Sequence, residues 1–435
     1  MVKLKKELSL FDATVYGVGI ILGAGIYALI GQAASIAGTA LWLSFVVGAL
    51  VSSFTGLSYA ELSTMFPKAA AEYFYVRGAF GSRFPAFLLG WIIVFTEIVA
   101  AATVALGFAG YFEALFAFSF GGLSRALIII LIALALIAIL SYVNFRGIRE
   151  SARLNILFTA IEAAGLILII LLAFNFYGKV NYFETPKGLS GIFSAAILVF
   201  FAYLGFEDIA NIAEETKNPK RDLPRAFILA IVTTTILYVL TCIATVSLAD
   251  WKKLGEVGNP LAFAASHSFL GENAKLLISF IALFATANTV LILLIVASRM
   301  IYGMAKDRSF PEKLAAVHEK THTPWLAVIV AMIFSMIFVF LGDIALVASI
   351  TSLGAFIAFA AVNLSLIWLR HTMPRAERAF RVPLNIGNYP LLAFLGLFSC
   401  IFMIFQFNLE LILFGLAILV VGAIIYKIYI KKLAR

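Results

Sequence analysis

Residues 16–27 read YGVGIILGAGIY and place four glycines within nine positions of an apolar run. Glycine costs a helix about 1 kcal/mol relative to alanine, so the cluster weakens any helix formed here. The spacing of Gly19 and Gly23 is also that of small residues that let two membrane helices pack closely. Two interpretations therefore stay open. The run is a packing surface, or it unwinds at membrane depth beside protein or a water-filled cavity.

A second candidate break lies in residues 200–216, which read FFAYLGFEDIANIAEET. Gly205 is followed by the adjacent carboxyl groups of Glu207 and Asp208, which are costly inside a membrane unless they face a polar cavity or are protonated. Alternatively, the apolar segment ends earlier and Glu207 lies in water. The two runs occupy corresponding places in two sets of five apolar segments, and such a pair of interrupted helices indicates a transporter's binding site.

The composition of the whole chain predicts an integral membrane protein. Of its 435 residues, 63% are hydrophobic and 13% are charged, whereas soluble domains are about half apolar and a quarter charged. A chain this apolar has too little polar surface to cover a water-soluble core. The net charge of +9 indicates no nucleic-acid partner, because the basic residues lie at the ends of apolar segments.

The sequence carries no signal for catalysis or for a bound cofactor. Cys242 and Cys400 lie within apolar segments and have the spacing of neither a disulfide framework nor a metal site. No nucleophile motif or phosphate-binding loop is found. We therefore expect neither an enzyme nor a protein with a metal or other cofactor.

Twelve apolar segments are long enough to cross the roughly 30 Å of bilayer hydrocarbon, which predicts an all-α fold with about twelve transmembrane helices. Only six of the 32 lysines and arginines fall in the loops opposite the N-terminus, and cytoplasmic loops carry the excess of positive charge. Both termini are therefore predicted to be cytoplasmic, in a multi-pass protein of the cell membrane. The spans lie near residues 10–34, 39–64, 84–112, 124–144, 152–175, 189–214, 223–248, 274–301, 324–341, 344–370, 388–406 and 409–430.

Four motifs resemble those of the amino acid–polyamine–organocation (APC) transporters. They are GAGIY at 23–27, YAELSTMFP at 59–67, the stretch from FAYLGFE to EETKNP at 201–219, and MAKD at 304–307, in family order over most of the chain. The third motif is the most specific of them. One departure is the run of three alanines at 69–71, where the family usually has a pair of glycines, and it concerns the loop between helices two and three.

The resemblance implies one transporter domain over residues 1–435. Residues 10–175 would form a first repeat of five helices, residues 189–370 a second, inverted repeat, and residues 388–430 two additional helices. Helices 1 and 6 would be broken, with the substrate site between them. Half-helix ends suit an amino acid, because free N–H groups attract a carboxylate and free carbonyl groups attract an ammonium.

The resemblance also implies which backbone groups bind the substrate. N–H groups of the first motif are expected to hold its carboxylate, and carbonyl groups of both breaks are expected to hold its ammonium. Phe201 is further expected to act as an aromatic gate over the substrate, its alternative role being ordinary packing in a chain with 41 phenylalanines. The expected donors are Gly23, Ala24 and Gly25, and the expected acceptors are Ile21, Phe201 and Leu204.

Carboxyl groups inside the predicted spans are candidates for coupling transport to an ion. Glu97 lies in the middle of the third span, Glu162 in the middle of the fifth and Glu207 in the sixth. Glu97 can also favour a substrate with a cationic side chain. Glu61 and Glu113 lie near the ends of spans, where we expect them to be in water.

Glu162 marks a second departure, because some proton-coupled relatives have a lysine near this place on helix five. A glutamate here can bind and release a proton during the transport cycle, or help to hold a cation. Alternatively, it is structural and hydrogen-bonded to polar side chains of the eighth span. The available partners there are Thr286, Asn288 and Thr289.

Together these features predict a secondary active transporter that moves amino acids by alternating access around helices 1 and 6, with proton coupling as the first expectation. Amino acid or amine exchange, sodium symport and polyamine transport are the alternatives. A passive channel is disfavoured, because the sequence has neither a filter-like repeat nor a ring of like charges. A nutrient sensor on the same fold would need an added signalling domain, for which the tails are too short.

Overall fold

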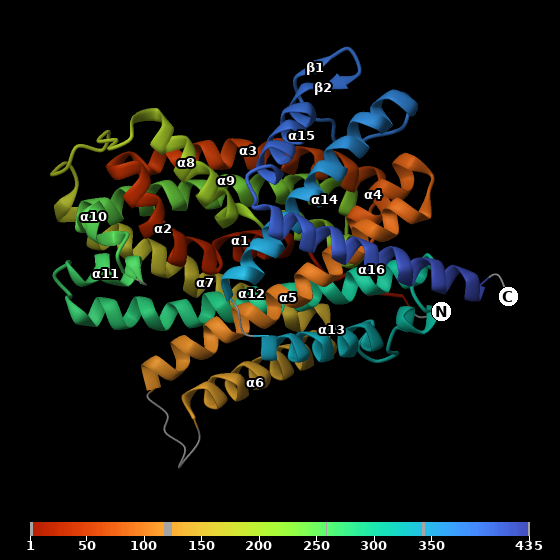
Figure 1. Cartoon of the computed structure of the whole chain (residues 1–435), viewed down its shortest axis with the longest axis horizontal. Helices are drawn as coiled ribbons and strands as arrows, with labels where there is room; N and C mark the ends of the chain where they lie inside the picture. The colour runs from red at the N-terminus through yellow and green to blue at the C-terminus, as the bar shows by residue number, and fades with distance from the viewer. Residues whose placement is uncertain (1–2, 117–123, 258, 342–343, 434–435) are drawn as a thin grey trace.

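The computed structural model describes residues 3–116, 124–257, 259–341 and 344–433, and these ranges are almost entirely helical. The helices run along the long axis of the molecule, and the described N- and C-terminal segments lie at the same end (Figure 1). Within these ranges only β1 (Asn385–Ile386) and β2 (Tyr389–Pro390) are strands, and they pair antiparallel in one short hairpin.

Ten helical segments of the described chain are long and apolar enough to cross a membrane, and two shorter apolar helices, α13 (Trp325–Phe338) and α15 (Leu391–Ile404), accompany them. They account for the twelve predicted spans and confirm the all-α membrane fold. The remaining long helices are α3 (Leu41–Met65), α5 (Arg83–Phe116), α6 (Arg125–Arg146), α7 (Ile148–Leu172), α9 (Pro219–Leu248), α12 (Glu272–Lys306), α14 (Ile344–Thr372) and α16 (Leu409–Leu433). The short connecting helices are η1 (Gly38–Ala40), α4 (Ala71–Phe80), η2 (Phe174–Phe176), α10 (Trp251–Leu254), α11 (Pro260–Ser266), η5 (Glu312–Ala315) and η6 (Val339–Leu341).

The first span is broken at Gly23, between α1 (Leu10–Leu22) and α2 (Ala24–Ala37). α1 starts at Ser9, whose hydroxyl accepts a hydrogen bond from the Asp12 N–H while the Asp12 carboxylate accepts one from the Ser9 N–H, a capping box. Both interpretations of the glycine run hold, at different positions. Gly23 forms the break, whereas a Cβ at Gly17 or Gly19 would collide with side chains of neighbouring helices.

The sixth span is broken as well, and it meets the first one. α8 (Gly188–Phe200) continues into the 3-10 turn η3 (Phe201–Tyr203), then the chain extends, and the 3-10 helix η4 (Phe206–Glu215) follows. Gly205 has φ +108°, a conformation that side chains with a Cβ rarely adopt. A Cβ at Gly205 would also collide with Ile20 of α1, so the two breaks pack directly against each other.

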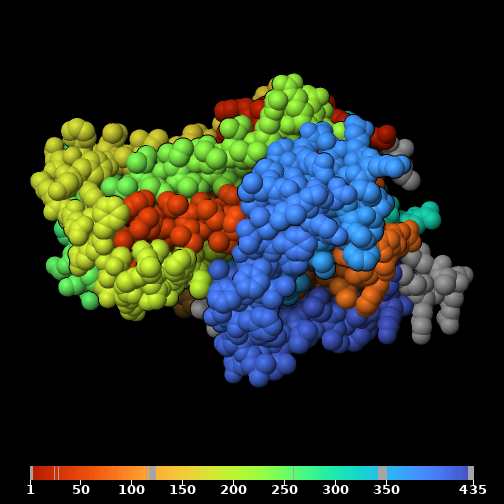
Figure 2. All heavy atoms as spheres, turned by 90° about the horizontal axis from the view of Figure 1, so that it is seen from above, coloured from red at the N-terminus to blue at the C-terminus, as the bar shows by residue number. Residues whose placement is uncertain are grey.

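α3 packs against both α8 and α9, so the second span covers the sixth and seventh on one face of the molecule. Figure 2 shows this face, with α3 in orange-red lying between α8 in yellow-green and α9 in green, and α14 and α15 in blue beside them. α12 is buried along almost its whole length and packs against α5 and α7. The breaks are thus enclosed by helices from both halves of the chain.

The loop of three alanines keeps the conformation that glycine would favour. Ala70 has φ +58° and ψ +53°, in the left-handed region. That region costs a residue with a Cβ about 1–2 kcal/mol. The Ala70 side chain lies where a Cβ at Gly303 would collide with it, so a close approach of α12 holds this turn in place. Ala70 therefore adopts, with local strain, a conformation that glycine takes without this cost.

The expectation that Glu61 lies in water is wrong. Its side chain is fully buried at the end of α3, 2.6 Å from the guanidinium of Arg370 and 2.9 Å from that of Arg378, and it accepts a hydrogen bond from the Val382 N–H. Glu113 is also largely covered, because it pairs with Arg125 at 2.7 Å. The segment after α14 folds back over the end of α3, which a span-by-span assignment does not anticipate.

Candidate functional site

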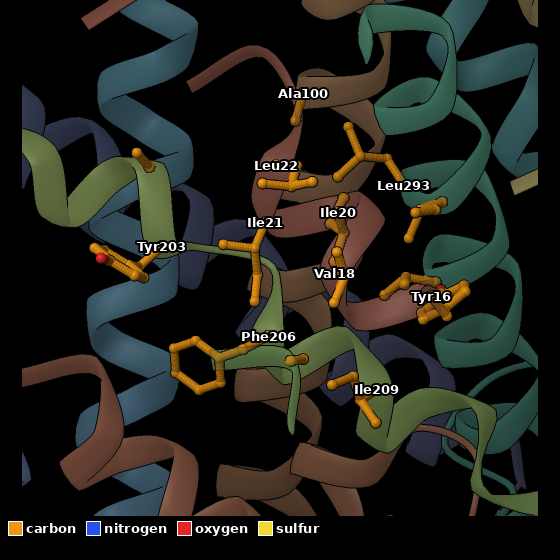
Figure 3. Close-up of a cluster of buried hydrophobic side chains, with 14 of the residues drawn as sticks. Tyr16, Val18, Ile20, Ile21, Leu22, Ala100, Tyr203, Phe206, Ile209 and Leu293 are labelled. Carbon is orange, nitrogen blue, oxygen red and sulfur yellow. The ribbon is translucent and has the colours of Figure 1, made fainter. Parts of the chain in front are cut away.

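A cavity of about 130 Å³ lies where the two broken spans meet. Since about 10–15 Å³ of such space suffices for one water molecule, it has room for several. Figure 3 shows Ile20 and Ile21 at the end of α1, lying between Phe206 on one side and Leu293 of α12 on the other. The lining residues that carry polar groups or belong to the breaks are Ile20, Ile21, Gly25, Tyr59, Glu72, Thr96, Glu97, Phe201, Ala202, Leu204, Gly205, Glu207, Asp208, Thr289 and Thr351.

The start of α2 presents the N–H donors expected from the sequence. Gly25 lines the cavity, and Ala24 is the first residue of α2. N–H groups in the first turn have no partner within their own helix, and no side chain of Gly23 caps them. The Gly23 N–H itself donates to the carbonyl of Gly19 at 3.3 Å and so continues α1. Of the three expected donors, Ala24 and Gly25 are the two that α1 leaves available.

The expected carbonyl acceptors, those of Ile21, Phe201 and Leu204, belong to residues that line the cavity. The hydroxyl of Tyr238 on α9 lies within hydrogen-bond distance of the Ile21 carbonyl oxygen and 3.0 Å from that of Ala202. A carbonyl oxygen has two lone pairs, so Ile21 can accept a second bond. Tyr238 thus ties the two breaks together. The sequence analysis missed it, because a tyrosine in an apolar span carries no distinguishing signal.

Four carboxyl groups line the cavity, those of Glu72, Glu97, Glu207 and Asp208. No lysine or arginine does so among the residues that the structure describes. Glu207 accepts a hydrogen bond from the Gly205 N–H at 2.8 Å, and it faces the cavity rather than bulk water. The sequence analysis selected Glu97 and Glu207. Carboxyl groups gathered around one space attract positive charge, so this cavity suits a proton or an ammonium group.

Glu72 reaches the cavity from outside the spans, because α4 folds back beneath them. Its side chain is buried, and Asn211 of η4 donates to it at 3.3 Å while accepting from the Ala71 N–H at 3.1 Å. Burial raises the pKa of Glu72 to about 7, although hydrogen bonds to the carboxylate oppose the rise. The carboxyl group is therefore mostly protonated below pH 7 and mostly ionised above it.

Replacing Glu72→Gln is expected to flatten the pH dependence of uptake near pH 7 and that of stability between about pH 4.5 and 7. The native carboxyl group holds a proton between its ordinary pKa of 4.5 and about 7, where the unfolded one does not. Its contribution to stability is therefore lost as pH rises through that window. Thermal unfolding of the purified protein measures this slope. The exposed control Glu319→Gln should keep the wild-type slope, and an unchanged slope in Glu72→Gln would contradict a titration at this carboxyl group.

Glu162 does not line the cavity. It is fully buried on α7, and neither of its carboxylate oxygens makes a hydrogen bond or an ion pair within the described part of the chain. The Asn288 amide of the eighth span nevertheless lies close enough to interact with this carboxyl group, so the structural alternative stays open. The hydroxyls of Thr286 and Thr289 donate to carbonyls of their own helix, and Asn288 also bonds with Asn155 and Thr159.

A second cavity of about 340 Å³ adjoins the first, and Phe201 and Leu204 line both. Its other walls include Leu29 of α2 and Ile197 of α8. These two half-helices lead away from the end of the molecule that holds the termini (Figure 1). Phe201 and Leu204 therefore lie between the central cavity and a larger space on that side.

Comparisons with known proteins agree with this architecture. The family model described as amino acid permease matches residues 8–426. The branched-chain amino acid permease BcaP of Bacillus subtilis is 31% identical, and the match covers 99% of this chain and 94% of the relative. A methylthioribose transporter of Bacillus subtilis is 30% identical with the same coverage. Cationic amino acid transporter 1 of Arabidopsis thaliana is 29% identical, over 85% of this chain and 63% of the relative. The chain therefore belongs to the amino acid permease family of the APC superfamily, and it is a transporter rather than an enzyme.

Proposed function

We propose that the protein is a secondary active transporter that carries an amino acid across the cell membrane by alternating access, with both termini in the cytoplasm. The observation that carries the proposal is the meeting of two interrupted helices over a cavity lined by carboxyl groups and half-helix ends. Interrupted helices at corresponding places mark the substrate site in transporters of this kind. Each interrupted helix is the first span of its half of the chain. The halves, residues 10–175 and residues 189–370, are proposed as inverted repeats.

The substrate pose follows from the polarity of the half-helix ends. The α-carboxylate lies at the start of α2, at the N–H groups of Ala24 and Gly25, where the helix dipole is positive. The ammonium lies at the carbonyls of Ile21, Phe201 and Leu204. Phe201 covers the bound molecule on the side of the second cavity and moves away when the substrate leaves in that direction.

The side-chain pocket combines apolar and acidic surface. Ile93, Ala100, Val104 and Leu293 supply apolar walls, with Glu97 among them. We propose that the substrate side chain is apolar or cationic, because an anionic one would face uncompensated carboxylates. The names of the relatives include both branched-chain and cationic amino acids. A polyamine is the alternative substrate, since it satisfies the acids but leaves the N–H groups at the start of α2 without an anion.

Proton coupling is proposed to involve Glu162. A fully buried carboxylate in a span with no paired cation costs several kcal/mol, even beside the Asn288 amide. A bound proton or another cation removes that cost. Glu162 lies beside the first span, because the Tyr27 hydroxyl on α2 donates to the Glu162 backbone carbonyl at 3.3 Å. Movement of the broken helix can thus expose the carboxyl group and let the proton leave. Sodium symport uses the same carboxylate as a ligand, and exchange leaves it structural.

Uptake of labelled amino acids and polyamines into proteoliposomes tests this function. An inward proton gradient is expected to drive accumulation of apolar or cationic amino acids, while a sodium gradient alone is not. Accumulation driven by sodium would favour the symport alternative. Entry that depends on preloaded substrate, with neither gradient effective, would favour exchange. Uptake that never exceeds equilibration under any gradient would contradict secondary active transport.

Replacing Glu162→Gln is expected to abolish accumulation driven by a proton gradient while leaving substrate binding within about threefold of wild type. Glutamine keeps the shape of the neutral carboxyl group but neither binds nor releases a proton. Two readouts separate the effects: gradient-driven uptake, and equilibrium binding of labelled substrate to purified protein. The exposed variant Glu256→Gln serves as the control. If Glu162→Gln retains gradient-driven uptake, this residue does not carry the coupling proton.

A further inference from the structure

A polar cavity of about 480 Å³ lies away from the substrate site, at the end of the molecule that holds the termini. It is open to solvent and is bounded by the segment before α1, the first two turns of α7, and Lys217, which lies two residues after η4. Basic side chains dominate its wall. The lining residues are Lys5, Lys6, Glu7, Leu8, Asp12, Arg149, Ala152, Arg153 and Lys217.

Backbone hydrogen bonds assemble this cavity from distant parts of the chain. The N–H groups of Glu7 and Leu8 donate to the Glu215 carbonyl at 2.9 and 3.0 Å, and the Lys217 N–H donates to the Leu8 carbonyl at 2.9 Å. This short parallel bridge sets the N-terminal lysines beside Lys217. α1 packs against α7, which brings Arg149 to the same space.

The two carboxylates in the wall of this pocket already have partners elsewhere. Asp12 accepts hydrogen bonds from Ser9 in the cap of α1, and Glu7 pairs with Lys5 at 2.6 Å. The remaining four cations have no ion pair and no side-chain hydrogen bond among the described residues. Several unneutralised positive charges around one cavity repel each other, and an anion relieves that repulsion. The four are Lys6, Arg149, Arg153 and Lys217.

We propose that this basic pocket, defined by Lys6, Arg149, Arg153 and Lys217, binds the phosphate group of an anionic phospholipid. Lysine and arginine donate charge-assisted hydrogen bonds to phosphate oxygens. The pocket lies at the N-terminal ends of α1 and α7, which are the ends of the first and fifth spans. In the topology proposed above these ends face the cytoplasmic leaflet, and basic pockets between transmembrane helices are recognised sites for anionic headgroups. A soluble phosphate compound shares this chemistry, but it has no reason to concentrate at the membrane surface.

A bound headgroup would bridge two parts of the transporter. Lys6 and Lys217 belong to the segment that ties α1 to the end of η4, whereas Arg149 and Arg153 belong to α7. If the proposed alternating access is correct, α1 and η4 move relative to α7 when the cytoplasmic side opens, so the lipid stabilises the closed arrangement. The binding itself does not depend on that function.

Native mass spectrometry of the full-length detergent-purified protein tests the proposal, with titration of phosphatidylglycerol, phosphatidylcholine and inorganic phosphate in parallel. Phosphatidylglycerol is expected to bind saturably and more tightly than phosphatidylcholine. Each cation near an anionic headgroup contributes about fivefold in affinity. The triple variant Lys6→Gln/Arg149→Gln/Arg153→Gln is therefore expected to weaken phosphatidylglycerol binding on the order of 100-fold.

The matched control is Lys220→Gln/Arg221→Gln/Arg225→Gln, which removes the same charge from exposed positions outside the pocket. It should bind phosphatidylglycerol like the wild type. Equal weakening in both triple variants would overturn the pocket in favour of diffuse charge attraction. Displacement of phosphatidylglycerol by inorganic phosphate at equal concentration would overturn the lipid as the ligand. Failure of amino acid uptake would leave these binding results unaffected, so the two proposals fail separately.

Discussion

Uptake is expected to fall on the order of 100-fold when Gly25→Val is introduced. A Cβ at this position would lie 2.9 Å from the Cα and 3.1 Å from the Cβ of Ala202, so valine forces the two broken helices apart. Overpacking strain of this kind is about 1–3 kcal/mol, which corresponds to roughly 5- to 150-fold in an equilibrium. We expect a loss near the upper limit of this range, because the displaced groups include the N–H donors at the start of α2 that are proposed to bind the substrate. Uptake into proteoliposomes and equilibrium binding of labelled substrate to purified protein measure the effect.

Gly107→Val on α5 provides the control for this experiment. A Cβ there meets no atom within 4 Å, so valine at position 107 should leave both binding and thermal stability close to wild type. Retained expression and a single unfolding transition in Gly25→Val would show that the fold survives the change. Wild-type affinity in a folded Gly25→Val protein would rule out the junction of α2 and η3 as the binding site.

Loss of the buried arginine on α12 is expected to have the largest effect on stability. Arg299 donates to Glu215 at 2.8 and 3.0 Å and also to Asn144, and the side chains of both ion-pair partners are at most 1% exposed. Arg299→Met leaves the Glu215 carboxylate buried without a partner. Breaking one side of a buried pair costs about 3–5 kcal/mol, so the temperature of thermal unfolding should fall clearly.

The double variant Arg299→Met/Glu215→Leu separates the uncompensated charge from the lost packing. Replacing both partners by apolar side chains is often neutral or stabilising, so most of the lost stability should return. A remainder of about 1–3 kcal/mol is expected, because the Asn144 side-chain oxygen loses its donor. Lys306→Met is the matched control, since it breaks the half-exposed pair with Glu214, and such pairs contribute about 0–1 kcal/mol. If the double variant is no more stable than Arg299→Met, the unpaired Glu215 carboxylate is not the cause of the lost stability.

The ion pair also connects moving and stationary parts under the proposed transport cycle. Glu215 ends η4, the second half of the broken sixth span, and Arg299 lies on α12. If the proposed cycle opens the cavity toward the termini by moving η4 away from α12, both charges become exposed. Arg299→Met would then favour the open arrangement as well as destabilising the fold.

The number of spans, their approximate positions and the two breaks could be predicted from the sequence, because lipid imposes strong local rules. A span must be a continuous apolar helix of sufficient length, and unwound backbone is tolerated only where something other than lipid covers it. The glycines at 23 and 205 and the acids that follow the second of them therefore stand out against an apolar background. These signals are local in the chain, and tertiary packing does not reverse them.

The neighbours of each polar side chain required the tertiary structure. A helix that is apolar on every side gives no indication of which face it turns inward. The sequence therefore did not predict that Glu97 lines the cavity and that Glu162 does not. The Tyr238 hydroxyl donates to a carbonyl group in each of the two breaks. Glu72 lines the cavity from α4, a helix that lies outside the spans. Glu61 was expected in water and lies buried between two arginines. Each of these contacts joins residues far apart in the chain, and a periodic pattern along one segment carries no information about its partner.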